Sequence, residues 1–268
     1  MGDITGLTRI MFILADPILH VRGSAMFNAH FESVGIDAAC IPLHVVPADL
    51  ASTASSIRSM QNVAGFGVTI PHKVAVMPLL DGISEWAQRI KAVNFVRRTA
   101  DGRLIGDNLD ATGFIAGLHS KGLSARGKRV LQIGAGGAGR ATAFAIARDG
   151  ASELVIDNRD RSKAEQLTAD IQGAYPGVTV RAGDAKPEDF DLIVNSTSLG
   201  LKTTDELPVD VSRISSSTVI YDIIVNPPVT RLMAAAEQRG AVVVGGAAML
   251  ASQMSLVGEF LFDVRSDR

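Results

Sequence analysis

A glycine-rich turn between an apolar strand and an alanine-rich helix constrains the fold of this chain more than any other feature. The segment reads KRVLQIGAGGAGRATAFAIA, and Gly134, Gly136 and Gly139 fit the pattern G-x-G-x-x-G. In this pattern the first glycine makes a tight turn, the second lets a pyrophosphate approach the backbone, and the third allows close helix packing. No Gly-Lys-Ser/Thr sequence follows, which disfavours a P-loop. We predict a dinucleotide site that includes Gly137 and Ala138.

The chain around this turn alternates strictly between strands and helices. From Gly127 onward the expected strands are KRVLQIG, ELVIDN, VTVRAG, FDLIVNS, TVIYDIIV and AVVVGG. Strands that alternate with helices are typical of a doubly wound parallel sheet. We therefore expect residues 116–245 to form a Rossmann dinucleotide-binding domain.

The first part of the chain also reads as α/β, with a different arrangement of strands. IMFILA, AACIPLHV and GFGVTI are expected strands, and AVNFVR and RLIGDN flank an Asp101-Gly102 turn that indicates a hairpin. The first sheet is therefore expected to be mixed. One helix is expected to start on Ser24 as N-cap, with Phe27, Phe31 and Val34 on one face, and Pro47 should open a second helix. Residues 1–115, joined by a terminal helix in 246–268, are the expected substrate lobe.

Composition narrows the class of function. The chain has 268 residues, 47% of them hydrophobic, and a formal net charge of −2, so no basic surface for nucleic acid or membrane is indicated. The one cysteine, Cys40, allows no intrachain disulfide and reads as a core residue; no metal-binding pattern is present. No signal peptide or membrane span is recognisable. We expect a cytoplasmic monomer or homodimer that acts on a small molecule.

The strand after the glycine turn ends in IDNRDRSK, which offers both acids and bases to the adenosine ribose. Asp157 and Asp160 could bind ribose hydroxyls and would repel a 2′-phosphate, and Asn158 between them is also predicted to bind the cofactor. The basic side chains of Arg159, Arg161 and Lys163 could instead pair with that phosphate. Repulsion by an acid at this position favours NAD as the cofactor, with NADP as the alternative.

Seven short motifs occur in the order and at the spacing of the shikimate dehydrogenase family, which this chain resembles over nearly its whole length. They are VTIPHK (68–73), KAVN (91–94), GDNLDATGF (106–114), GAGGAGRA (134–141), NSTSLG (195–200), YDIIVNPPVT (221–230) and GGAAMLASQ (245–253). The resemblance implies an oxidoreductase that moves hydride between a nicotinamide and a ring hydroxyl of a cyclic polyol acid such as shikimate or quinate. It also implies an N-terminal catalytic lobe beside a Rossmann lobe.

Position by position, the resemblance assigns Lys73 and Asp110 to catalysis and Thr69, Asn94 and Gln253 to substrate binding. Oxidising an alcohol requires a group that takes the hydroxyl proton, and the residues leave open whether Lys73 or Asp110 does so. Asp110 also fits the N-cap of a helix that begins ATGF. Near the cofactor the resemblance places Asn195, Ser196, Thr197, Ile223, Gly246 and Met249.

Several departures from the family gather where the substrate carboxylate would bind. The family's Ser-x-Ser pair falls on Val21 and Gly23, its asparagine before the motif threonine is Gly67, and a tyrosine is Val225. Either Arg22 or Ser24 replaces these contacts, or the substrate differs at that end. We expect weak activity on shikimate itself. An NADP-dependent biosynthetic shikimate dehydrogenase and a catalytically silent nucleotide sensor are the alternatives.

Overall fold

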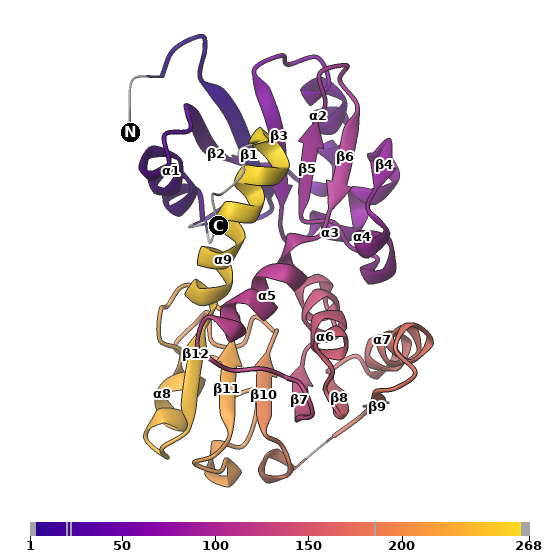
Figure 1. Cartoon of the computed structure of the whole chain (residues 1–268), viewed down its shortest axis with the longest axis vertical. Helices are drawn as coiled ribbons and strands as arrows, with labels where there is room; N and C mark the ends of the chain where they lie inside the picture. The colour runs from indigo at the N-terminus through magenta and orange to yellow at the C-terminus, as the bar shows by residue number, and fades with distance from the viewer. Residues whose placement is uncertain (1–3, 20, 22, 185, 264–268) are drawn as a thin grey trace. The chain divides into compact units, whose positions relative to one another are not determined.

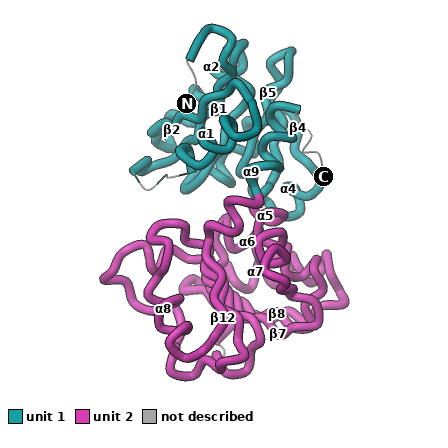
Figure 2. Tube along the Cα trace, turned by 60° about the vertical axis from the view of Figure 1, so that its left-hand side comes forward, with its two compact units in different colours: residues 1–109, 253–268 teal, residues 110–252 magenta. Residues whose placement is uncertain are grey.

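The computed structural model describes residues 4–19, 21, 23–184 and 186–263. Its strands form two separate six-stranded sheets (Figure 1). The chain divides into two compact units, which Figure 2 colours separately: unit 1 is residues 1–109 and 253–268, and unit 2 is residues 110–252. These divisions lie a few residues from the expected domain boundaries. No helix in the described ranges is long and apolar enough to cross a membrane.

The sheet of unit 1 has the order β2-β1-β3-β5-β6-β4 and is mixed, as expected. β1, β2 and β3 are parallel, whereas β5 runs antiparallel to both β3 and β6. The hairpin at Asp101-Gly102 is therefore confirmed. The strands are β1 (Arg9–Ala15), β2 (Ala38–His44), β3 (Val63–Val68), β4 (Gly82–Ile83), β5 (Phe95–Arg98) and β6 (Leu104–Asp107).

The helices of unit 1 bury apolar stripes against this sheet. Leu50, Ala54 and Ile57 of α2 lie in the same core cluster as Phe66 and Val96 of the strands. Pro47 opens a short 3-10 turn, η1, which leads directly into α2. The helices are α1 (Gly23–Ser33), η1 (Pro47–Asp49), α2 (Leu50–Ile57), α3 (His72–Ala75), η2 (Met77–Leu79) and α4 (Glu85–Ile90).

The sheet of unit 2 is entirely parallel, with the order β12-β11-β10-β7-β8-β9. Numbered from its own first strand, this is the 3-2-1-4-5-6 order of a Rossmann fold. The six strands are those expected: β7 (Arg129–Ile133), β8 (Glu153–Asp157), β9 (Thr179–Ala182), β10 (Leu192–Asn195), β11 (Val219–Asp222) and β12 (Val242–Gly245). Its helices are α5 (Leu109–His119), α6 (Gly137–Asp149), α7 (Arg161–Ala174), η3 (Pro187–Asp189), η4 (Val211–Arg213) and α8 (Arg231–Glu237), followed by α9 (Gly246–Phe262).

Two helix starts differ from the sequence-based expectation. α1 begins at Gly23, so Ser24 lies inside the first turn and is not its N-cap, and Val34 lies beyond the helix with 48% of its surface exposed. α5 begins at Leu109, which makes Asp110 a first-turn residue rather than the N-cap. The preference of a single side chain for the N-cap position is worth only about 1 kcal/mol, so it does not fix the residue at which a helix begins.

Candidate functional site

The glycine-rich turn of unit 2 is shaped by close backbone contacts. Gly134 has φ +109°, a conformation that favours glycine, and a Cβ on Gly139 would lie 2.4 Å from the Gly134 carbonyl oxygen. Gly136 is the N-cap of α6, and a Cβ built on it would meet nothing within 4 Å. Backbone atoms therefore occupy the space where a side chain at position 139 would lie, whereas the space beside Gly136 is open. A helix N-terminus beside an open glycine is the cradle that a pyrophosphate needs.

Two buried side chains, Gln132 and Thr142, stabilise this turn through hydrogen bonds, and neither of them was predicted from the sequence. The Nε2 of Gln132 donates to the carbonyl oxygens of Gly134 (2.8 Å) and Gly139 (2.7 Å), and its Oε1 accepts from the Thr142 hydroxyl at 2.8 Å. Gln132 and Thr142 are fully buried. A polar residue inside an otherwise apolar strand was the available signal, because a buried amide must find partners.

The loop after β10 packs directly on the glycine turn. Ser196 donates from its hydroxyl to the Ile133 carbonyl at 2.7 Å, and a Cβ on Gly134 would lie 2.6 Å from that hydroxyl oxygen. Asn195 accepts from both the backbone N–H and the hydroxyl of Thr197. The side chains of Asn195, Ser196 and Thr197, which are predicted cofactor residues, are therefore engaged in hydrogen bonds that fix this loop against the glycine turn.

Asp222 connects the loop after β10 to the loop after β11 through hydrogen bonds. Its carboxylate is buried and accepts hydrogen bonds from Asn195 Nδ2 (3.1 Å), the Ile224 N–H (3.1 Å) and the Thr230 hydroxyl (2.7 Å). Burial nevertheless raises its pKa above the ordinary aspartate value. The loop is also fixed at Gly246, where a Cβ would lie 2.2 Å from the Ile223 carbonyl oxygen. Met249, in the first turn of α9, is buried.

The segment expected to bind the adenosine ribose lies at the end of β8. Asn158 accepts from the Ala135 N–H at 3.0 Å, so this segment is tied to the glycine turn. Burial and the neighbouring Asp184 raise the pKa of Asp157. Asp160 is exposed, and hydrogen bonds from Ser162 and Lys163 lower its pKa, so it remains ionised. Arg159 is exposed beside it.

In unit 1 the predicted substrate residues follow the carboxyl end of β3. Thr69 donates its backbone N–H to the Leu14 carbonyl at 3.0 Å, and Lys73 is half-buried in the first turn of α3, where its carbonyl accepts from the Val93 N–H at 2.8 Å. His72 is fully buried, and its Nε2 lies 2.7 Å from the Val45 carbonyl oxygen. His72 is thus a structural neighbour that ties the lysine segment to the loop after β2.

Asn94 and Gln253 meet at one residue of unit 1. The Asn94 side-chain oxygen accepts from the Leu109 N–H at 2.7 Å, and Gln253 Nε2 donates to the Leu109 carbonyl at 3.4 Å. Leu109 directly precedes Asp110 in the chain. Two residues predicted to bind substrate therefore also fix the backbone beside the predicted catalytic aspartate. Asn94 and Gln253 are both buried, with exposures of 3% and 5%.

Two of the departures from the family, Gly23 and Gly67, lie beside one aromatic pair in unit 1. A Cβ on Gly67 would lie 3.0 Å from the Phe95 ring, and a Cβ on Gly23 would lie 3.8 Å from the Phe27 ring. The two rings pack edge to face with centroids 6.0 Å apart. Val21 is half-buried nearby in sequence, whereas Arg22 lies outside the described residues. The Phe95 ring therefore fills the space that a side chain at position 67 would need.

Neither a metal site nor a reactive thiol is found among the described residues. They include no group of three or more His, Cys, Asp or Glu side chains arranged to hold a metal ion. Cys40 is 3% exposed, and burial raises the pKa of its thiol to about 12, so the thiolate does not form near neutral pH. Its placement in the core confirms the sequence-based expectation.

An all-parallel Rossmann sheet with an open glycine turn, in a chain with a second α/β unit, defines the class as dinucleotide-dependent oxidoreductases. The comparisons with known proteins agree. Residues 13–96 match the model of the shikimate dehydrogenase substrate binding domain, and residues 118–243 match that of shikimate / quinate 5-dehydrogenase. The chain belongs to the shikimate and quinate dehydrogenase family.

Three relatives illustrate the range of this family. A shikimate dehydrogenase (NADP(+)) of Geobacter metallireducens is 39% identical, over 94% of this chain and 90% of its own. The 5-ketofructose reductase of Gluconobacter sp. strain CHM43, solved without ligand, is 34% identical with a TM-score of 0.87, covering 98% of this chain and 96% of its own. A Listeria monocytogenes shikimate 5-dehydrogenase in complex with shikimate and NAD is 27% identical with a TM-score of 0.88, covering 100% and 96%.

Proposed function

We propose that this protein transfers hydride between a nicotinamide dinucleotide, with NAD favoured over NADP, and a ring hydroxyl of a shikimate- or quinate-like cyclic polyol acid. The observation that carries the proposal is the position of Lys73 in a chain of this family. Lys73 lies just after β3, and its carbonyl accepts a hydrogen bond from the N–H of Val93, the residue that directly precedes Asn94. Unit 1 supplies the substrate groups and unit 2 the dinucleotide site.

Oxidation of an alcohol removes a hydride from carbon and a proton from the hydroxyl group, and each needs its own acceptor. The bound nicotinamide supplies the hydride acceptor. The protein must take the hydroxyl proton as the C–H bond breaks, and an amine or carboxylate in hydrogen-bond reach does this. We assign this proton transfer to Lys73 and Asp110, with Thr69 and Asn94 orienting the hydroxyl groups of the substrate. The Asn94 oxygen is occupied by Leu109, which leaves the amide N–H group of Asn94 to donate.

Replacing Lys73 tests the catalytic assignment. Lys73→Met keeps most of the length of the side chain and removes the amine, so kcat should fall by roughly 10²- to 10⁴-fold, the usual contribution of a positioned acid or base. Lys91→Asn is the matched control, because Lys91 is an exposed lysine of the same unit with φ 57°, a conformation that asparagine tolerates. Retained kcat in the methionine variant would remove Lys73 from the chemistry.

The preference for NAD rests on charge at the end of β8. Two of the three basic residues there already have acidic partners: Arg161 lies 3.0 Å from Glu165, and Lys163 lies 3.5 Å from Asp160. An ionised Asp160 would repel a 2′-phosphate. Arg159 supports the opposite choice, as do the names of the curated relatives, which specify NADP(+).

Steady-state kinetics with both cofactors decides between them. The wild type should give the higher kcat/KM with NAD. Asp160→Asn should raise the efficiency with NADP by about two- to fivefold, the size of one exposed charge interaction. Arg159→Gln should lower it with NADP and leave NAD unchanged. A clear preference of the wild type for NADP would contradict the proposal and favour a biosynthetic shikimate dehydrogenase.

A second candidate function is the reduction of an uncharged keto sugar. It is favoured by the apolar surroundings of Gly23 and Gly67, where Phe27 and Phe95 stand in place of hydrogen-bond donors. The likeness to a 5-ketofructose reductase supports it independently, since 5-ketofructose carries no carboxylate. Losing hydrogen bonds to a charged carboxylate would weaken the binding of an acid by roughly 1.5–3 kcal/mol each.

A substrate panel separates the two candidates. The oxidation of shikimate, its uncharged methyl ester and quinate by NAD⁺ or NADP⁺ should be compared by kcat/KM with the reduction of 5-ketofructose by NADH or NADPH. The acid function predicts that quinate exceeds the ester and the keto sugar, whereas the second candidate predicts the reverse order. Gly23→Ser is a matched probe because its Cβ fits at 3.8 Å, and it should improve only the acids. Cofactor binding without any turnover would indicate a silent nucleotide sensor.

A further inference from the structure

A pocket of about 480 Å³ lies in unit 1, away from the residues discussed above. It is bordered by the start of β1, the residues before and at the start of β3, the end of β5 and the end of α9. Its lining residues are Arg9, Gln61, Val63, Arg97, Arg98, Thr99, Ala100, Leu261 and Asp263. Thr69 and Lys73 follow the opposite, carboxyl end of β3. The pocket and the predicted substrate residues are therefore at the two ends of the same strand.

Aromatic rings hold two of the arginines in this pocket. The Arg9 guanidinium lies 5.3 Å from the centre of the Phe262 ring, and the Arg97 guanidinium lies 5.7 Å from that of Phe260. A cation over an aromatic face is fixed in place while its N–H groups stay available for hydrogen bonds. The ring contacts thus orient the two guanidinium groups without using any of their N–H donors.

Acidic partners for these arginines are few. Arg97 Nη1 lies 3.4 Å from Asp263, whose side chain is 81% exposed, and no ion pair of Arg9 is formed within the described ranges. The Arg97 Nε is buried and finds no hydrogen-bond partner among the described residues. A guanidinium carries five N–H donors, so most of the capacity of Arg97 is unused. Unused donors next to a cavity favour an anion.

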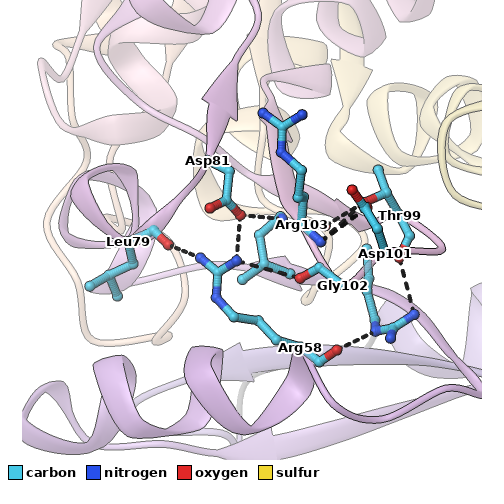
Figure 3. A network of polar contacts seen from close by, with 9 residues as sticks. Arg58, Leu79, Asp81, Thr99, Asp101, Gly102 and Arg103 are labelled. Atoms are coloured by element: carbon cyan, nitrogen blue, oxygen red, sulfur yellow. Dashed lines mark hydrogen bonds and ion pairs between the residues drawn. The ribbon is translucent and has the colours of Figure 1, made fainter.

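The third arginine builds the wall of the pocket instead. Arg98 is 7% exposed and donates from Nε to the Arg58 carbonyl at 2.9 Å and from Nη1 to the Thr99 carbonyl at 3.1 Å. Arg58 in turn donates to Asp81 and to the carbonyl oxygens of Leu79 (2.8 Å) and Gly102, as Figure 3 shows. This network fixes the β5–β6 turn and therefore that side of the pocket, so the site is rigid there.

We propose that this pocket binds a small organic anion bearing carboxylate or phosphate groups, held by Arg9 and Arg97. Its volume lies within the usual range for small-molecule sites. Val63, Leu261 and Ala100 supply apolar lining for the carbon skeleton, and Gln61 adds a polar side chain to the lining. The three arginines outweigh the single Asp263 in charge, which suits a ligand with two or more negative charges.

The structural alternative is that both arginines only anchor the end of α9. Cations stabilise helix C-termini, and Phe260 and Phe262 belong to the last turn of this helix. That role would make the arginines important for stability but would create no saturable binding of anions. Measuring binding and stability on the same variants distinguishes the two roles.

Calorimetric titration of the full chain with inorganic phosphate, and separately with citrate, tests the proposal. Saturating NAD should be present throughout, because the glycine-rich turn of unit 2 is itself suited to phosphate. We expect saturable binding of both anions, and the tighter one identifies the preferred group. Arg97→Gln and Arg9→Gln should each weaken binding by about tenfold or more, as expected for loss of a charge-assisted hydrogen bond.

Arg89→Gln is the matched control, since Arg89 is an exposed arginine of α4 in the same unit that does not line the pocket. It should leave both affinities unchanged. Arg97→Lys should bind with intermediate strength because it keeps the charge but loses the planar fork. If neither anion binds saturably, or if Arg97→Gln and Arg9→Gln bind as the wild type does, the proposal is wrong and the arginines serve α9 alone. Should Arg97→Gln fail to fold, the Arg9 variant decides.

Discussion

Tyr221 is the largest side chain that the structure buries completely, and its hydroxyl has no hydrogen-bond partner among the described residues. Its ring stacks on Phe114 with centroids 4.5 Å apart, so packing holds the residue in place. Burial raises the pKa of the hydroxyl. The ring stabilises the fold while the hydroxyl opposes it, since a buried donor without a partner costs about 1–3 kcal/mol.

Tyr221→Phe should therefore raise the midpoint of thermal unfolding. A gain of about 1 kcal/mol corresponds to roughly 2–4 °C in a chain of this size. The measurement is Tm by circular dichroism, with Tyr175→Phe as control because Tyr175 is the other tyrosine and is only half-buried. A lower Tm in Tyr221→Phe would mean that the hydroxyl has a partner in solution.

The raised pKa of Asp222 predicts that its contribution to stability changes with pH in the direction opposite to that of most carboxylates. Its native pKa is raised by burial, in spite of the hydrogen bonds from Thr230, Ile224 and Asn195. The native state then holds the proton more tightly than the unfolded state, so the contribution of Asp222 to stability is greatest at acid pH and is lost as pH rises through the raised pKa. Asp222→Asn cannot ionise. The difference in Tm, variant minus wild type, should increase from acid to neutral pH, and a constant difference would contradict this account.

At the scale of an element, the turn between β7 and α6 separates two kinds of glycine. A Cβ built on Gly139 would lie 2.4 Å from the Gly134 carbonyl oxygen, whereas a Cβ built on Gly136 would meet nothing within 4 Å, and the backbone of Gly136 is in a conformation that alanine can adopt. The same sequence pattern thus contains one glycine whose Cβ position is filled by backbone and one whose Cβ position is open, and we propose that the pyrophosphate binds beside the open one.

Two alanine substitutions should show this difference. Gly139→Ala should lower stability by about 1–3 kcal/mol, the usual cost of overpacking. Gly136→Ala should leave Tm within about 2 °C and yet raise KM for both cofactors strongly, because its methyl group enters the pyrophosphate cradle. Thermal unfolding and initial-rate kinetics on the two variants provide the test. Unchanged KM in Gly136→Ala would place the cofactor elsewhere.

At the scale of the whole molecule, helix α9 belongs to both units. It runs without interruption from Gly246 to Phe262, and the division between the units falls at residues 252 and 253 within it. Met249 is buried in unit 2, while Val257 and Leu261 are buried in unit 1. Each unit therefore takes core residues from the same continuous helix. Unfolding of one unit should disrupt this helix and so also destabilise the other unit.

We expect the two units to unfold together and to respond together to the cofactor. NAD at about 100 times its Kd should add about 2.7 kcal/mol to the stability of the form that binds it. Trp86 is the single tryptophan and lies in α4 of unit 1, so its fluorescence follows the unit that does not contain the glycine turn. An equal rise of the midpoint by fluorescence and by circular dichroism is expected. If NAD does not change the unfolding midpoint measured by Trp86 fluorescence, the two units unfold independently.

Local patterns predicted much of this fold. Alternating strands and helices predicted the parallel sheet of unit 2 strand by strand, and Asp101-Gly102 predicted the hairpin of unit 1, because both signals depend on neighbours along the chain. The starts of α1 and α5 were misplaced, because one capping side chain does not fix the residue at which a helix begins. Gln132 was missed because its partners, Gly139 and Thr142, become neighbours only when the helix folds back on the strand.

The sequence by itself determined the class of fold, the dinucleotide turn and the family, because these rest on residue types at short, regular spacings. Only the tertiary structure decided which residues share a neighbourhood: Asn94 and Gln253 meet at Leu109, and the departures at Gly23 and Gly67 meet at one aromatic pair. The arginine pocket likewise unites the ends of β1, β5 and α9. Long-range packing sets such contacts, and no local pattern in the chain encodes which distant side chains will fill the same space.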